Sequence, residues 1–68
     1  MKNSEGTSRL CIHTKDIVLL TGYSEGYCRR LIREIRARNS KQPHQPVTIS
    51  EFCSYFGFTE ADVRKRLN

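Results

Sequence analysis

A short glycine turn occurs twice in this 68-residue chain, and its position limits what the chain can fold into. The tripeptides GYS at 22–24 and GFT at 57–59 lie 35 residues apart, and each ends in a hydroxyl residue. Glycine commonly ends a helix in a left-handed conformation, and serine or threonine is a favoured first cap of a helix. The turns therefore predict four short helices arranged as two pairs.

Apolar residues between the turns recur with the period of an α-helix. The first pair is predicted at 14–21, capped by Thr14, and at 24–38; the second begins with a capping box, Thr48 with Glu51, and resumes after Thr59. The predicted inward positions are Ile17, Val18, Leu20, Thr21, Cys28, Leu31, Ile32, Ile35, Phe52, Cys53, Phe56, Val63 and Leu67.

The predicted fold class is all-α, with four short helices forming two tandem helix-turn-helix units around one small core. A chain this short holds a single domain. Residues 1–10 are predicted as a flexible tail, 11–38 as the first unit, 39–47 as a loop containing two prolines, and 48–68 as the second helix pair. No segment has the pattern of a strand. The likeness of the two halves can also arise by convergence, because any short helix pair requires these residue types.

Positive charge is concentrated in one segment. The chain has 12 basic and 7 acidic residues, a net charge of +5. Residues 29–41 contain one acid, Glu34, and six of the bases, so the rest of the chain is neutral. Localised positive charge favours a polyanionic partner. The alternative is a solvated helix whose last arginines complement the helix dipole. The six bases are Arg29, Arg30, Arg33, Arg36, Arg38 and Lys41.

Several function classes have no support in the sequence. Neither paired carboxylates, nor a nucleophile beside a base, nor a phosphate-binding loop is evident, so we predict no enzyme, no cofactor and no small-molecule substrate. Three cysteines without a C-x-x-C pair predict reduced thiols and no metal site. The longest apolar run is 17–20, far below the roughly 18 residues of a membrane span, and no secretory signal is visible. A cytoplasmic protein is predicted.

The segment TKDIVLLTGYSEGYCRRLIR, residues 14–33, resembles the helix-turn-helix of prokaryotic DNA-binding proteins. The segment TISEFCSYFGFTEADVRKRL, residues 48–67, resembles the same motif, with features of small excisionase and MerR-type helix pairs. Val18 stands where the motif usually has a small residue. Arg66 stands at a core position of the second copy, which predicts that this copy supports the fold or a dimer contact. Neither copy is followed by a glycine-rich β-hairpin, so the sequence does not indicate a wing.

The resemblance implies duplex DNA binding, with 24–38 as the recognition helix in the major groove, by a small transcription regulator or a recombination or excision accessory protein. A guanidinium there can make a bidentate contact to guanine. A homodimer or tandem binding is expected, because one such helix covers few base pairs. The implied base-facing residues are Ser24, Glu25, Gly26, Arg29, Arg30 and Arg33; Tyr27 is placed against sugar-phosphate, and Arg36, Arg38 and Lys41 against phosphates.

Two other partners stay open at this point. The same arginine face suits an acidic protein, in which case the chain is the docking module of a larger regulator. It also suits RNA. Titration of duplex, single strand and structured RNA at two salt concentrations separates these alternatives, because phosphate contacts make binding strongly salt-dependent.

Overall fold

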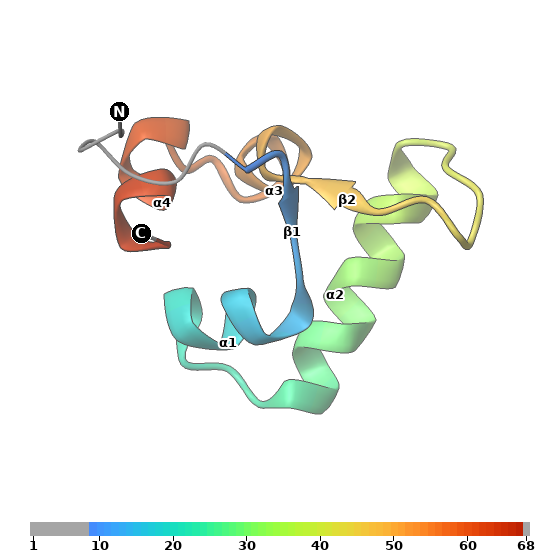
Figure 1. The fold of residues 1–68 in the computed structure, drawn as a ribbon. Helices are drawn as coiled ribbons and strands as arrows, with labels where there is room; N and C mark the ends of the chain where they lie inside the picture. The colour runs from blue at the N-terminus through green and yellow to red at the C-terminus, as the bar shows by residue number, and fades with distance from the viewer. Residues whose placement is uncertain (1–8, 68) are drawn as a thin grey trace.

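The computed structural model describes residues 9–67, and four helices occupy most of them. The order of elements is β1 (Cys11–Ile12), α1 (Thr14–Thr21), α2 (Glu25–Arg38), β2 (Val47–Thr48), α3 (Ile49–Phe56) and α4 (Glu60–Arg66). In Figure 1, α2 is the longest helix, with α1 beside its beginning and the loop to β2 leaving from its end. The mainly helical class is as predicted.

The prediction that the chain has no strand is wrong. β1 and β2 form a two-stranded antiparallel sheet in which Cys11 faces Thr48 and Ile12 faces Val47. Strands of two residues are too short to show the alternation that identifies a strand in a sequence. Their pairing is a tertiary contact between segments far apart in the chain, so the predicted loop ends one residue earlier, before Val47.

The predicted tail covers 1–10, and its residues 1–8 lie outside the described part of the chain. Arg9 and Leu10 both contact the folded domain. The Arg9 guanidinium lies 2.7 Å from the Asp16 carboxylate, and the Leu10 carbonyl accepts a 2.8 Å hydrogen bond from the backbone N–H of Ile49. The hydrogen bond between Ile49 and Leu10 extends the connection between the two halves beyond the short sheet.

The repeat of 35 residues is present in the described structure. α1 and α3 start and end at equivalent positions, and each is followed by a glycine with positive φ, 80° at Gly22 and 84° at Gly57. Strands related by a two-fold axis pair antiparallel, with equivalent residues facing each other. Ile12 and Val47 are equivalent under the offset and face each other in the sheet. The first helix of each half, its terminal glycine and one strand residue therefore correspond under the offset of 35 residues.

One hydrophobic core lies between the halves. Most predicted inward residues are buried in it, and Val18, Leu20, Phe56 and Leu67 are partly buried against it. Three further core residues come from the strands and the start of α3. The buried set is Ile12, Ile17, Cys28, Leu31, Ile32, Ile35, Val47, Ile49, Phe52, Cys53 and Val63.

Three of the four predicted caps are confirmed, and the first is wrong by one residue. His13, not Thr14, precedes α1, and its backbone N–H donates to the Asp16 carboxylate at 2.8 Å. At α3 the predicted capping box is complete: the Glu51 N–H donates to Thr48 Oγ1 at 3.0 Å, and the Thr48 N–H donates to Glu51 Oε1 at 2.9 Å. Carboxylates at these positions accept from N–H groups that the helix itself leaves unpaired.

The two capping carboxylates make stability sensitive to acid. Burial alone would raise the pKa of each, but hydrogen bonds and the nearby cations, Arg9 at Asp16 and Lys41 at Glu51, hold both pKa values below the usual range. Their contribution is complete above about pH 5 and is lost as the pH falls through the lowered folded-state pKa values. We expect the free energy of unfolding, measured in urea from pH 6 to pH 2, to fall below about pH 4.

The matched control for this pH dependence is the double variant Asp16→Asn, Glu51→Gln. Amide oxygens still accept the capping hydrogen bonds, but they carry no charge and do not titrate. The variant should be less stable than the natural chain at pH 6 and should lose less stability on acidification. Parallel pH profiles for the two proteins would contradict the assignment.

Candidate nucleic-acid interface

The recognition-helix candidate, α2, has two chemically different sides. Its buried side consists of Cys28, Leu31, Ile32 and Ile35, as the sequence predicted. Ser24 caps it, with the Oγ accepting from the backbone N–H of Tyr27 at 3.2 Å. Because the buried side is packed into the core from Cys28 to Ile35, the opposite side of these turns is presented on a rigid element.

The outward side carries four of the predicted contact residues next to one another in the helix. Gly26, Arg29, Arg30 and Arg33 are all exposed. A Cβ added to Gly26 would meet no atom within 4 Å, so the space in front of this helix position is open. A partner can therefore approach the α2 backbone at Gly26 without displacing any described side chain.

The charges of this outward side are not neutralised by other elements. Arg29 lies 3.4 Å from Glu25 on the same helix, and both side chains are more than half exposed, so the pair is worth little. The Arg30 guanidinium lies 5.9 Å from the centre of the Tyr27 ring. Among residues 9–67, Arg33 has no hydrogen-bond or ion-pair partner. The face therefore keeps a positive potential directed to solvent.

A shallow hollow of about 430 Å³ lies beside this face. It is lined by Thr14 at the start of α1 and, on α2, by Gly26, Ile32 and three arginines, Arg29, Arg33 and Arg36. Guanidinium groups around a concave surface suit an anion such as a phosphate. No sequence pattern indicates the part that Thr14 plays, because the approach of α1 to this side of α2 is a tertiary feature.

Two of the predicted phosphate contacts, Arg36 and Lys41, bind the loop before β2. The Arg36 Nε donates to the Gln45 carbonyl at 2.9 Å, and the Lys41 Nζ donates to the Pro46 carbonyl at 3.0 Å. Lys41 is also 3.2 Å from Glu51 in a largely buried ion pair. Both residues hold the loop in place, a role that their position in the sequence did not reveal.

Arg38 lies on a third side of α2, toward α3. Its guanidinium is 5.1 Å from the centre of the Tyr55 ring, and the Tyr55 hydroxyl donates to Glu34 at 3.0 Å. This hydrogen bond is the main reason that the pKa of Tyr55 is raised. Tyr27 shares an edge-to-face contact with Tyr23, at 5.1 Å between ring centres, and both are partly exposed. The ten residues predicted to contact DNA are therefore not all on one surface. Some lie on the open face of α2, Arg36 and Lys41 bind the loop before β2, and Arg38 lies at the contact between α2 and α3.

The second half offers a weaker basic surface. Arg64, equivalent to Arg29, donates to the Arg9 carbonyl and lies 3.4 Å from Glu60, so it connects α4 to the segment before β1. Lys65 and Arg66 are exposed. The acids Glu60 and Asp62 in the first turn of α4 oppose phosphate binding at that end. α4 carries three bases and two acids, against five bases and two acids on α2, so its surface is less positive.

Other kinds of site find no support in residues 9–67. This part of the chain has no group of three side chains that could hold a metal ion, and its three cysteines are unpaired. Cys28 and Cys53 are buried, and burial raises the pKa of the Cys53 thiol. None of the described helices has the length and apolar character needed to cross a bilayer.

Comparison of this chain with protein-family models, with characterised proteins and with solved structures finds no match. The candidate function is therefore argued from the geometry and charge of α2 alone.

Proposed function

We propose that this chain binds duplex DNA by placing the outward face of α2 in the major groove. In this proposal α1 with α2, and α3 with α4, are tandem helix-turn-helix units, of which the first reads DNA and the second supports it. The protein acts in the cytoplasm of a prokaryote as a small transcription regulator or a recombination or excision accessory protein.

The observation that carries the proposal is the open arginine face itself. Arg29, Arg30 and Arg33 point away from the core of a firmly packed helix, and none of them pairs with a carboxylate of another element. The major groove of B-DNA admits an α-helix, and arginine suits both guanine edges and phosphates. The proposal does not include three other bases among the residues that contact DNA bases, because each already has a contact within the fold. They are Arg36, Arg38 and Lys41.

Gly26 supports the same orientation. Glycine lowers the stability of a helix interior by about 1 kcal/mol relative to alanine, so its presence on a well-packed helix has a cost. It lies one turn before Arg29 and Arg30, in the first turn of the helix. Close approach of a DNA backbone or base edge at this position would make use of the missing side chain.

Titration with nucleic acids at several salt concentrations tests the proposal. Three arginines that neutralise three phosphates give a slope of log affinity against log salt of about −2.7, so raising salt from about 50 to 200 mM should weaken duplex binding about 40-fold. We expect duplex DNA to bind more tightly than a single strand of the same sequence or a structured RNA, as measured by fluorescence anisotropy.

The outcomes of this titration separate the candidate partners. Tighter binding of structured RNA than of duplex DNA would replace the proposal with RNA binding. If no nucleic acid binds at 50 mM salt or below, the arginine face would instead be assigned to an acidic protein partner.

A further inference from the structure

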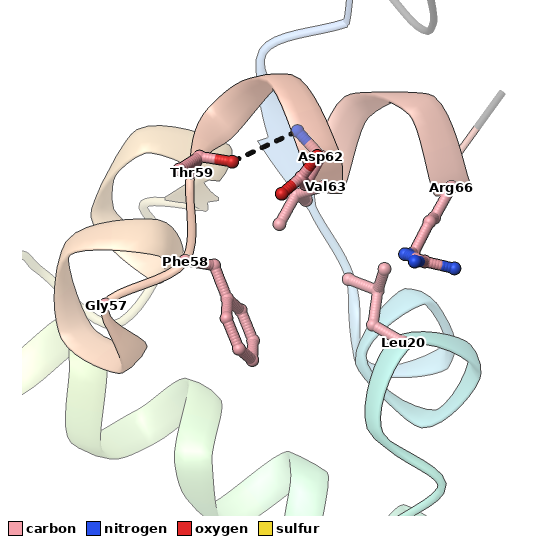
Figure 2. Close-up of a pocket in the computed structure, with 7 residues that line it drawn as sticks. All are labelled: Leu20, Gly57, Phe58, Thr59, Asp62, Val63 and Arg66. Carbon is pink, nitrogen blue, oxygen red and sulfur yellow. Dashed lines mark hydrogen bonds between the residues drawn. The ribbon is translucent and has the colours of Figure 1, made fainter.

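A groove of about 460 Å³ lies on the side of the molecule formed by α1 and α4. Figure 2 shows Leu20 reaching toward α4 from α1, with the partly exposed Phe58 and the buried Val63 also lining the groove. Asp62 and Arg66 stand on the polar part of the lining. The groove thus combines an apolar floor with one charge of each sign.

The internal repeat allows this groove to be compared with the equivalent region around α3. Tyr55 of α3 is equivalent to Leu20 of α1, and its hydroxyl and ring contact Glu34 and Arg38 in the last two turns of α2. The helix that faces Leu20 in the equivalent way is α4. It has 7 residues, whereas α2 has 14. The turns that cover Tyr55 therefore have no counterpart over Leu20 among the described residues.

The same comparison singles out Leu19, the neighbour of Leu20. Leu19 is 80 % exposed, the highest value among the exposed large hydrophobic residues described. Its equivalent in α3 is Ser54, also exposed, so this fold position requires no apolar side chain. Lys15, one turn before Leu19, is exposed as well, and its equivalent is Ser50. The outer surface of α1 is therefore apolar and basic where that of α3 is neutral and polar.

The charges at the groove also lack partners within the fold. Asp62 and Arg66 are one helical turn apart on α4, yet within residues 9–67 neither side chain takes part in an ion pair. An exposed lysine beside an exposed leucine matches a groove that has an apolar floor and a free carboxylate. The chain itself carries this combination, in Lys15 and Leu19.

We propose that the α1–α4 groove binds α1 of a second copy of this chain, with Leu19 seated on Leu20, Phe58 and Val63 and with Lys15 beside Asp62. A two-fold symmetric interface must be self-complementary, so each copy has to present both the projecting residue and its receptor. Leu19 and the groove meet this condition, because Leu20 lines the groove and Leu19 adjoins it in the same helix.

The apolar centre of the proposed dimer contact, at Leu19 and Leu20, lies away from the arginine face of α2, whereas Lys15 lines a hollow together with Glu25 and Arg29 at the border of that face. The hollow beside that face is bordered by Thr14, at the opposite end of α1 from Leu20. Two copies would then present two α2 helices, as binding to two half-sites requires. The dimer itself does not depend on the proposed DNA binding, and it is tested without nucleic acid.

The test is sedimentation equilibrium of the full chain over a concentration series from about 1 µM to 1 mM. We expect the mass to rise with concentration from 7.9 kDa toward twice that value. Leu19→Ser, which copies the chain's own residue at the equivalent position, should weaken the dimer at least tenfold, because it removes one large apolar side chain per copy. Leu10→Ser is the matched control, since Leu10 is also largely exposed but does not line the groove.

Charge variants test the orientation of the second copy. Lys15→Asp and Asp62→Lys should each weaken the dimer, and the double variant should recover at least part of the loss. A natural chain that stays at 7.9 kDa up to 1 mM would overturn the proposal, as would a Leu19→Ser chain that dimerises like the natural one. Loss of dimerisation in Leu10→Ser equal to that in Leu19→Ser would also overturn it.

Discussion

Replacement of Phe52 with alanine is expected to remove a large part of the protein's stability at room temperature. Phe52 is completely buried, and its ring lies 4.9 Å from that of Phe56 and 5.8 Å from that of Phe58. Removing a buried phenylalanine costs about 3–5 kcal/mol. A chain of this length has about 3–10 kcal/mol of stability in total. The far-ultraviolet circular dichroism and the urea midpoint of the variant measure the loss.

Phe58→Ala is the control for this core prediction. Phe58 belongs to the same aromatic cluster but is 44 % exposed, so its truncation leaves less of a cavity. We expect it to cost less than half as much stability as Phe52→Ala. Equal losses, or a Phe52→Ala protein within about 1 kcal/mol of the natural chain, would show that the core is not centred on Phe52.

The helices were predictable because their signals are local. Gly22 and Gly57 both adopt the left-handed conformation expected of a helix-ending glycine, and Ser24, Thr48 and Thr59 cap the helices that follow. The apolar period of 24–38 gave the buried side of α2 without error. Such features depend on a few neighbouring residues, so they can be read in order along a sequence.

The features that the sequence did not reveal depend on contacts between distant residues. β1 and β2 are visible only as a pair, and Ile12, Val47 and Ile49 become core residues because that pair brings the two halves together. The number of charges in a segment likewise does not show that Arg36 binds a loop of the protein while Arg33 stays exposed. Gln45 lies close enough to engage Arg36 only after the proline-containing loop has folded back on α2.

For the proposed DNA interface, the double variant Arg30→Ala, Arg33→Ala is expected to reduce duplex affinity about 100-fold without unfolding the chain, since one good arginine–guanine contact is worth about 1–3 kcal/mol. Both side chains are exposed and outside the core, so the urea midpoint should be unchanged. Lys65→Ala, which removes an exposed positive charge from α4, is the matched control and should change affinity less than threefold.

Arg33→Lys separates the two ways in which this face can bind. Lysine keeps the charge but lacks the planar fork that pairs with guanine, so a base-reading Arg33 loses most of its contribution and the salt dependence is retained. If Arg33 contacts a phosphate, Arg33→Lys should bind nearly as well as the natural chain, and Arg33→Ala should reduce the salt slope by about one. Unchanged duplex affinity in the Arg30→Ala, Arg33→Ala protein would exclude α2 as the recognition helix.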